Sequence, residues 1–493
     1  MSQDTRVVSG TAELSADEQE RALGARNRLV IGLLLGSAFV VILNETIMGV
    51  ALPRLIVDLD ITAGTAQWLT AAFMLTMAVV IPITGYLLQR FHSRTLFIAA
   101  MSLFVAGTAI AAIAPGFTIL LVARVVQASG TAIMFPLLMT TVMTLVPAET
   151  RGRMMGNISI VMSVAPAIGP TISGLILNVF SWRFMFVFVL PIAILALVLG
   201  VIFMKNITEP SASRVDVLSI VLSAIGFGGL VYGLSVAGTA QSPFELWLPI
   251  GIGVLSLAFF VWRQLRLQRT DRALLDLRTL MSANFSLSIV MFAISMMAMF
   301  GVIVLLPIYL VDSLHLEEIN VGLLLLPGGL VTGLLAPFVG RFYDRVGPRI
   351  PLIAGAILVS ADLWAMAMLL NADSGWPTVL LAHVVLSIGL ALLFTPLFTA
   401  SLGSLRPQLY AHGSAIIGTI QQLAGAAGTA LFVTVMSSQL IRLQAQGAST
   451  AVATAAGVHS ALLFGAIISL AGIVVSLFIR KPVEQPGAAP MGH

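Results

Sequence analysis

The sequence predicts an all-α protein that crosses a membrane about fourteen times. Three observations support this fold class. Of the 493 residues, 58% are hydrophobic and only 9% are charged, whereas soluble domains carry about 25% charged residues. The apolar residues form runs long enough to cross a bilayer, and the basic residues gather on one side of those runs. Lipid must therefore be the solvent for most of the protein's surface.

Fourteen apolar runs are separated by charged residues, prolines and glycines. A helix needs about 20 mostly apolar residues to cross about 30 Å of hydrocarbon. Residues 1–28 are polar and the first run is too long for a signal-peptide core, so we expect that run to stay as a membrane anchor. The predicted spans are 28–53, 66–88, 95–114, 118–146, 153–178, 184–204, 216–237, 246–264, 283–311, 320–340, 349–370, 377–402, 411–440 and 458–480.

The placement of basic residues supports this number of spans. With both termini in the cytoplasm, all but four of the 25 Lys and Arg residues fall on the inner side. Arg54, Arg183 and Arg442 fall outside, and Arg124 falls within a span. Multi-span proteins show this excess of basic residues in their inner loops. Removing one span would invert every later loop and destroy the asymmetry, so the count of fourteen is favoured.

The composition also excludes several classes of function. The chain has no cysteine, which excludes disulfides, thiolate metal sites and thiol catalysis. Its two lysines, Lys205 and Lys481, do not stand in a GxxxxGK[ST] phosphate loop, so ATP is not expected to drive it. The net charge of +4 does not indicate nucleic acid, because the basic residues do not cluster on a soluble domain. We expect no metal, no cofactor and no nucleic-acid partner.

An internal repeat divides the chain into two halves. Residues 85–94 follow the second span and residues 340–349 follow the tenth, and both have the form G-x-(L/F)-x-x-R-x-x-x-R. Repeated halves with a site near the midplane between them are typical of secondary transporters. The predicted segments are a tail at 1–27, a six-helix bundle at 28–204, two extra helices with linkers at 205–282, a second six-helix bundle at 283–480 and a tail at 481–493.

The repeated loops also carry a family pattern. The second copy, with Gly340, Asp344 and Arg345, is similar to the G-x-L-x-D-R-x-G-R-(K/R) loop that follows the second helix in the major facilitator superfamily and recurs in its second half. The first copy keeps Gly85 and Arg90 but has Gln89 at the Asp position and His92 at the position of the second Gly. The resemblance to that family implies that these loops act as conformational latches.

Three further motifs lie inside predicted spans. Residues 120–130 are similar to the family's fourth-helix motif with its intramembrane Arg, and residues 165–174 resemble the fifth-helix antiporter motif G-x-x-x-G-P-x-x-G-G. Residues 43–53 resemble the first-helix pattern L-D-x-T-I-V-N-V-A-L-P, with Asn44 at the Asp position and Glu45 beside it. Between residues 28 and 480 the chain thus resembles the fourteen-helix drug:proton antiporter branch. That resemblance implies an exporter driven by inward-moving protons.

Titratable residues inside the spans are candidates for proton coupling. Glu45 and Asp362 are two carboxylates at bilayer depth, where an ionised group usually faces a cavity, a partner or a proton path. At about 1.5 Å per residue, both lie about 10–14 Å from the outer ends of their helices, as do Arg124 and His383. We expect Glu45 to carry the proton with Arg124 as its partner, and Asp362 with His383 to form a second titrating pair. A structural ion pair is the alternative interpretation.

Gating and substrate residues are predicted by side-chain type. Gly169, Pro170 and Gly174 permit a kink and a close helix approach, which suits a hinge. Amides in hydrocarbon need a partner or a cavity, and thioethers and aromatic faces suit lipophilic cations. The candidate substrate contacts are Asn44, Gln127, Phe135, Met139, Phe292, Met296, Gln421 and Gln422.

Together these features predict a proton-coupled multidrug exporter of amphipathic, cationic or neutral organic compounds. It would work by alternating access as a monomer among the lipids of the cell membrane. A dedicated exporter of one endogenous metabolite or antibiotic is the alternative, and the breadth of its substrates separates the two. A membrane enzyme or a non-transporting scaffold is a further alternative. An enzyme should show His, Asp and Glu clustered with catalytic spacing, and the sequence has no HExxH or paired-His motif.

Overall fold

A computed structural model describes residues 16–207, 216–237 and 242–482. In these ranges fourteen helices are long and apolar enough to cross a membrane, which confirms the predicted number of spans. The helices are α1 Ala16–Asp58, α2 Ala63–Arg90, α3 Ser93–Ala112, α4 Phe117–Leu145, α5 Arg151–Val179, α6 Arg183–Phe203, α7 Val217–Ser235, α8 Pro243–Leu267, α9 Ala283–Asp312, α10 Glu318–Val346, α11 Arg349–Leu369, α12 Trp376–Gly403, α13 Tyr410–Ala445 and α14 Thr450–Ser476.

The first helix begins earlier than the sequence analysis expects. Residues 16–27 belong to the predicted polar tail, whereas α1 already begins at Ala16. This segment is rich in Ala, Glu, Gln and Arg, which have high helix propensity, so the helix continues beyond its apolar part. The rest of the predicted tails, at 1–15 and 483–493, lies outside the described residues, as do 208–215 and 238–241.

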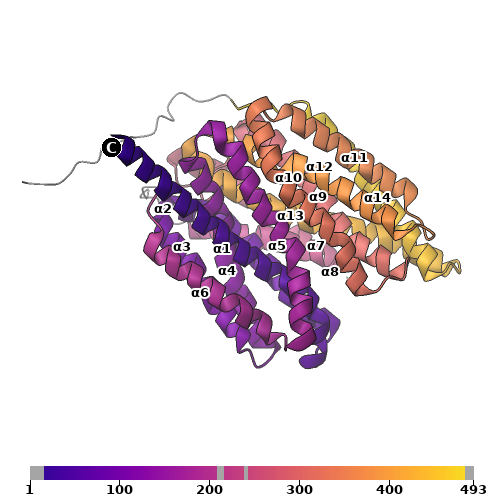
Figure 1. Ribbon diagram of the computed structural model, residues 1–493. Coiled ribbons are helices and arrows are strands. Elements are labelled where there is room, and N and C mark those ends of the chain that lie inside the picture. The colour runs from indigo at the N-terminus through magenta and orange to yellow at the C-terminus, as the bar shows by residue number, and fades with distance from the viewer. Residues whose placement is uncertain (1–15, 208–215, 238–241, 483–493) are drawn as a thin grey trace, which may run out of the picture.

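Two groups of helices form the body of the molecule. Most of the helices α1–α6 pack mainly against one another, and so do most of α9–α14, whereas α5 and α10 pack most extensively on each other. Figure 1 shows the first group in indigo to magenta on one side and the second group in orange to yellow on the other. The groups meet where α5 lies along α10, the most extensive helix pair in the structure, and where α2 lies along α13. These two seams carry most of the contacts between the halves, and further contacts join α4 to α13 and α5 to α12.

The central pair, α7 and α8, forms a hairpin beside one of these seams. Helix α7 packs against both α2 and α13. Ala78 of α2, Val231 of α7 and Ala426 of α13 form a small apolar cluster. The rings of Trp68 and Tyr232 stack with their centroids 5.7 Å apart. Helix α7 therefore covers the α2/α13 seam and contacts both halves of the protein at once.

An ion pair holds the two helices of this hairpin together. Arg263 of α8 donates from Nε and Nη2 to the two carboxylate oxygens of Asp216, at 2.7 and 2.8 Å. These hydrogen bonds hold the pKa of the Asp216 carboxyl below its usual range. A bidentate Arg–carboxylate pair fixes orientation as well as distance. The start of α7 is thus fixed against the last turns of α8.

The second and tenth helices finish at the same end of the bundle. Gly85, near the end of α2, lies against His412 near the start of α13, and Gly340, near the end of α10, lies against Gly152 at the start of α5. The starts of α5 and α13 are neighbours, because the Arg151 guanidinium lies 5.8 Å from the centroid of the Tyr410 ring. We call this end, where both repeated loops lie, the motif end.

Candidate functional site

Glu45 and Arg124 face each other inside the first group of helices. Glu45 on α1 and Arg124 on α4 lie within electrostatic reach of one another. Arg124 is only 1% exposed, and Glu45 is half-buried. Neither belongs to the ion pairs found among the described residues. The two groups therefore lie near one another without forming a direct ion pair.

Neighbouring groups hold the Arg124 side chain in place. Its Nε donates to the Leu69 carbonyl at 3.4 Å and its Nη1 donates to Gln127 Oε1 at 3.1 Å. Its Cζ lies 4.1 Å from the centroid of the Phe73 ring. Gln127 in turn donates to Thr108 Oγ1 at 2.9 Å. Residues three apart share one face of a helix, so Gln127 serves Arg124 in this structure rather than facing open space.

The fifth-helix motif lies directly beside this pair. Gly169 of α5 faces Thr46 of α1, the residue after Glu45, and a Cβ at Gly169 would overlap the Thr46 hydroxyl. The expected close helix approach is therefore found at Gly169. At Gly174 an added Cβ would meet nothing within 4 Å, so that glycine lies outside the contact. Helix α5 runs without interruption through the exposed Pro170.

Replacing Gly169 with Val should reduce transport at least tenfold, because overpacking a tight contact costs about 1–3 kcal/mol. The added methyl groups would push Thr46 and α1 away from α5. Efflux from proteoliposomes measures the effect, with the yield of folded protein checked by size-exclusion chromatography. Gly174→Val is the matched control and should keep normal efflux, since its side chain enters open space. Normal efflux by Gly169→Val would contradict a functional role for this contact.

Asp362 and His383 do not form the predicted second pair. His383 of α12 faces α10, where its Nε2 lies 3.2 Å from the Leu325 carbonyl and a Cβ at Gly328 would touch its ring. Asp362 is 5% exposed, and its Oδ2 has no hydrogen-bond partner among the described residues. Its helix, α11, packs mainly on α12 and α14. Within the part of the chain that the structure describes, Glu45 is the one of these two carboxylates with a cation in reach.

An aromatic cluster joins the two halves. Phe135 of α4 packs edge-on against Phe398 of α12, with centroids 5.9 Å apart. Phe292 of α9 lies 5.0 Å from Phe398 and 5.8 Å from Phe394. The sequence analysis missed Phe394 and Phe398, because α12 is apolar on all sides and no periodicity marks its inner face. The predicted contacts Met139 and Met296 are also buried.

Three predicted amides lack partners. Asn44 is 3% exposed, and its Nδ2 has no hydrogen-bond partner among the described residues. Gln421 and Gln422 of α13 are half-buried and buried, and their side chains take part in none of the side-chain hydrogen bonds found among the described residues. Gly418, one turn earlier on α13, lies against Phe135. Buried amides without partners are costly, so these groups are suited to binding a polar part of a ligand.

At the motif end, Asp344 fastens α10 to α5. Its Oδ1 accepts from the backbone N–H of Gly152 at 2.8 Å and its Oδ2 accepts from that of Arg153 at 2.9 Å. These are among the first N–H groups of α5, which have no partner within their own helix and favour a negative charge. A Cβ at Gly340 would overlap the Gly152 carbonyl. Arg345 is exposed and forms none of the ion pairs in the described ranges.

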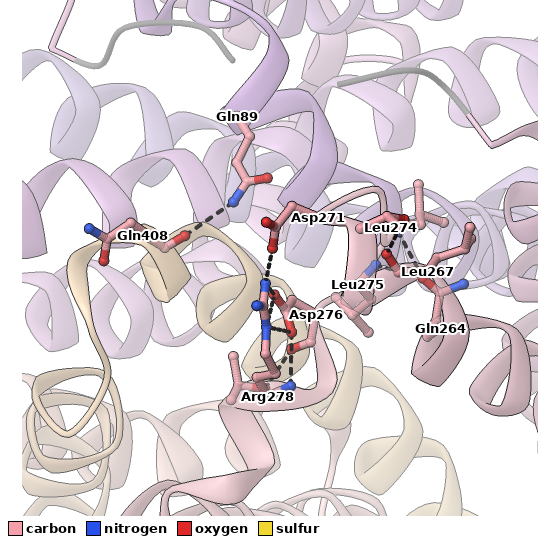
Figure 2. A network of polar contacts seen from close by, with 11 residues as sticks. Gln89, Gln264, Leu267, Asp271, Leu274, Leu275, Asp276, Arg278 and Gln408 are labelled. Atoms are coloured by element: carbon pink, nitrogen blue, oxygen red, sulfur yellow. Dashed lines mark hydrogen bonds and ion pairs between the residues drawn. The ribbon is translucent and has the colours of Figure 1, made fainter. Parts of the chain in front are cut away.

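The first copy of the loop makes a different contact. Gln89 donates from Nε2 to the Gln408 carbonyl at 3.1 Å, just before α13 (Figure 2). A Cβ at Gly85 would lie 2.9 Å from His412 Nδ1. Arg90 is exposed. The neutral amide donates to a carbonyl here, whereas the carboxylate of the second copy accepts from a helix N-terminus.

Two buried hydroxyl pairs connect the halves below these loops. Thr140 of α4 donates to Ser414 of α13 at 3.3 Å. Thr395 of α12 donates to Ser159 of α5 at 2.9 Å. Both pairs join residues of the first group of helices to residues of the second. The halves are therefore linked by a loop contact at each seam and by hydroxyl pairs that join α4 to α13 and α5 to α12.

Comparison with known proteins places the chain in a family. The family model described as Major Facilitator Superfamily matches residues 34–429. The chain is 40% identical over 466 residues to the uncharacterized MFS-type transporter YcnB of Bacillus subtilis, covering 94% of this chain and 97% of the relative. It is 40% identical over 472 residues to the lincomycin resistance protein LmrB of Listeria monocytogenes, covering 94% and 99%.

More distant proteins share the same architecture. The multidrug resistance protein B homolog of Mycobacterium tuberculosis is 28% identical over 423 residues, covering 84% of this chain and 78% of the relative. Two solved structures match in fold alone. The human organic anion transporter MFSD10 has a TM-score of 0.63 at 14% identity, covering 91% of this chain and 99% of that one. The proton:xylose symporter XylE has a TM-score of 0.62 at 13% identity, covering 93% of this chain and 97% of that one. This chain therefore belongs to the major facilitator superfamily and is a multi-pass membrane transporter, not an enzyme.

Proposed function

We propose that the protein is a proton-coupled exporter that exchanges amphipathic organic compounds for protons by alternating access. The observation that carries the proposal is the half-buried Glu45 within electrostatic reach of the buried Arg124. A carboxylate in this setting can bind and release a proton, and each state changes its attraction to the fixed cation. We further propose that the motif end faces the cytoplasm of a bacterial-type cell membrane, because the basic residues gather there.

The contacts around Glu45 would link its protonation to a movement of helices. Arg124 is held by Gln127, Phe73 and a backbone carbonyl, so a change in attraction moves Glu45 and α1 rather than Arg124. Thr46, next to Glu45, touches Gly169 of α5, and α5 is the helix that packs along α10. Protonation of Glu45 would thus loosen α1 and shift the α5/α10 seam. The six-helix halves at 28–204 and 283–480 would rock about that seam.

The substrate site is proposed where the halves meet near the aromatic cluster. The rings of Phe135, Phe292 and Phe398 offer faces and edges for an aromatic or lipophilic cation. The unpartnered amides of Gln421 and Gln422 would bind polar groups of the same compound. Relatives named for lincomycin resistance and for multidrug resistance support an exported organic compound. A compound with one ring and several hydroxyl or amine groups fits this combination of surfaces.

Efflux from proteoliposomes under an imposed pH gradient tests the proposal. A fluorescent lipophilic cation and lincomycin serve as probes, with the gradient set across otherwise identical vesicles. We expect transport to require the gradient and to stop when a protonophore collapses it. Transport that ignores the gradient would overturn proton coupling. A panel of unrelated compounds then separates a multidrug exporter, which several of them inhibit, from a dedicated exporter, which only one chemical series inhibits.

A further inference from the structure

Arg124 has a counterpart in the second half of the chain. Helices α4 and α12 are the fourth helices of their groups. Arg124 follows Gly116, the N-cap of α4, by eight residues, and His383 follows Gly375, the N-cap of α12, by eight residues as well. At about 1.5 Å per residue, both residues lie about 12 Å beyond the start of their helix. His383 therefore holds the position in the second half that Arg124 holds in the first.

Both side chains reach the second helix of their own group. The Arg124 guanidinium donates to the Leu69 carbonyl of α2 at 3.4 Å, and His383 Nε2 lies 3.2 Å from the Leu325 carbonyl of α10. These two leucines follow the N-caps of their helices by seven and eight residues. A carbonyl oxygen only accepts, so Nε2 of His383 carries a hydrogen in this contact. The other ring nitrogen, Nδ1, has no hydrogen-bond partner among the described residues.

The contact between the first and fifth helices also recurs. Gly169 of α5 and Gly428 of α13 each follow the N-cap of their helix by 19 residues. A Cβ at Gly169 would overlap Thr46 of α1, and a Cβ at Gly428 would overlap the backbone of Met297 of α9. Thr46 and Met297 therefore hold equivalent positions in the two halves.

The second half has no acid at the position of Glu45. The residue before Thr46 is Glu45, whereas the residue before Met297 is the buried Met296. No charged group among the described residues lies within electrostatic reach of His383. A permanent cation without an acid nearby is costly inside a membrane, and a histidine avoids this cost because it can be neutral. The second half thus has a base that can lose its charge where the first half has a fixed cation.

The neighbouring helices do not supply the missing acid. Helix α12 packs on α5, α9, α10, α11 and α13. Apart from Asp362 of α11, the charged and titratable residues of these five helices lie in their first or last two turns. Asp362 has no electrostatic interaction with His383. A proton on His383 would therefore leave an uncompensated charge in the arrangement described here.

This charge would act on the helix that joins the two halves. Gly328 of α10 lies so close to the His383 ring that a Cβ there would overlap it, and the next residue, Gly329, lies equally close to Ala167 of α5. Helix α10 is thus packed between α12 and α5, and Figure 1 shows α10 and α12 side by side. An unpaired charge on the ring favours an arrangement in which α12 and α10 separate and water reaches the imidazole.

We propose that His383 is the second proton-binding residue of the transport cycle and takes its proton on Nδ1. The proton comes from water on one side of the membrane and returns to water on the other side when the halves have moved. This inference rests on the proposed proton coupling and adds a ratio to it, since Glu45 and His383 together would carry two protons for each exported molecule. Both protons act on the α5/α10 seam, the first through Gly169 and the second through Gly328.

The number of protons moved per molecule tests the proposal. Proteoliposomes receive a gradient of about one pH unit and a series of concentration ratios of the fluorescent lipophilic cation, with the membrane potential held at zero by equal potassium and valinomycin. Net flux stops where the two gradients balance, and each proton moved per cation contributes about tenfold to that concentration ratio. We expect the wild type to balance at about 100-fold, the value for two protons. A balance near tenfold would mean one proton and would overturn the proposal.

Two substitutions assign the second proton. His383→Gln keeps a donor for the Leu325 carbonyl but cannot bind and release a proton, so the balance should fall to about tenfold. His459→Gln is the matched control, because His459 of α14 is also half-buried and lies against a backbone carbonyl, that of Ala367. Its balance should stay at about 100-fold.

The outcomes separate this inference from the proposed function. A balance of about 100-fold in His383→Gln would overturn the role of His383 and leave proton coupling through Glu45 intact. A wild type that ignores the pH gradient would overturn the proposed function, and this inference with it. If His383→Gln does not fold, His383→Arg decides in the same assay, because arginine keeps the donor and does not release its proton. A fall to about tenfold supports the proposal, and an unchanged ratio overturns it.

Discussion

Glu45→Gln should lower gradient-driven efflux on the order of 100-fold, the lower range for loss of a proton-transfer group. Glutamine keeps the size of the side chain but cannot bind and release a proton, so Arg124 would face the same neutral partner in every state. Substrate binding should stay within about threefold, because Glu45 is assigned to the proton and not to the substrate. Proteoliposome efflux and binding by fluorescence quenching measure the two quantities separately.

Asp362→Asn is the matched control for this prediction. It removes the other intramembrane carboxylate, whose helix packs mainly on α12 and α14. We expect gradient-driven efflux to stay within about twofold of wild type, since no cation lies in reach of this group among the described residues. Normal pumping by Glu45→Gln together with a loss of efflux in Asp362→Asn would move the proton site from α1 to α11.

Asp344→Asn should shift the motif end toward its open conformation by about 10–100-fold in equilibrium ratio. Asp344 accepts from two backbone N–H groups at the start of α5, and hydrogen bonds to charged groups contribute about 1.5–3 kcal/mol. Asparagine retains one acceptor oxygen and no charge. Efflux should slow as well, because the closed state becomes less populated. Spin labels at Glu149→Cys and Arg349→Cys, both exposed, measure the shift across the α5/α10 seam.

Arg345→Gln gives the comparison at the neighbouring position. Its side chain is exposed and outside the described ion pairs, so the equilibrium should move less than twofold. An equal effect of the two substitutions would mean that the overall charge of the loop, and not the capping of α5, closes this seam.

The sequence predicts the helices well because the bilayer limits what the chain can do. Each crossing needs a run of about 20 apolar residues with its backbone hydrogen-bonded internally, so the spans can be read directly. The depth of a residue also follows, since each residue advances the helix by about 1.5 Å. The depths of Glu45 and Arg124 in the bilayer, together with the motifs around these residues, are therefore enough to expect from the sequence alone that the two lie near one another.

The rotation of each helix could not be predicted in the same way. In a membrane the lipid-facing and core-facing sides are both apolar, so periodicity does not mark the inner face. For this reason Phe394 and Phe398 were missed, and His383 was paired with Asp362 although it faces α10. The two hydrogen bonds of the Gln127 side chain, with Arg124 and with Thr108, could not be predicted, because they depend on how α3 and α4 are rotated against each other. The packing of residues 271–282, in the linker between α8 and α9, could not be predicted either, because a charged linker has no sequence pattern that indicates where it folds back.

The position of α7 has a consequence for how compounds could enter from the lipid. A transporter of two rocking halves has two lateral windows between them, one along α5/α10 and one along α2/α13. Helix α7 packs on both α2 and α13 and therefore covers the second window. A compound dissolved in the membrane would meet helix α7 there, whereas neither α7 nor α8 packs extensively on α5 or α10 in the described residues. The two halves are built alike, but lateral access to the space between them would then be one-sided.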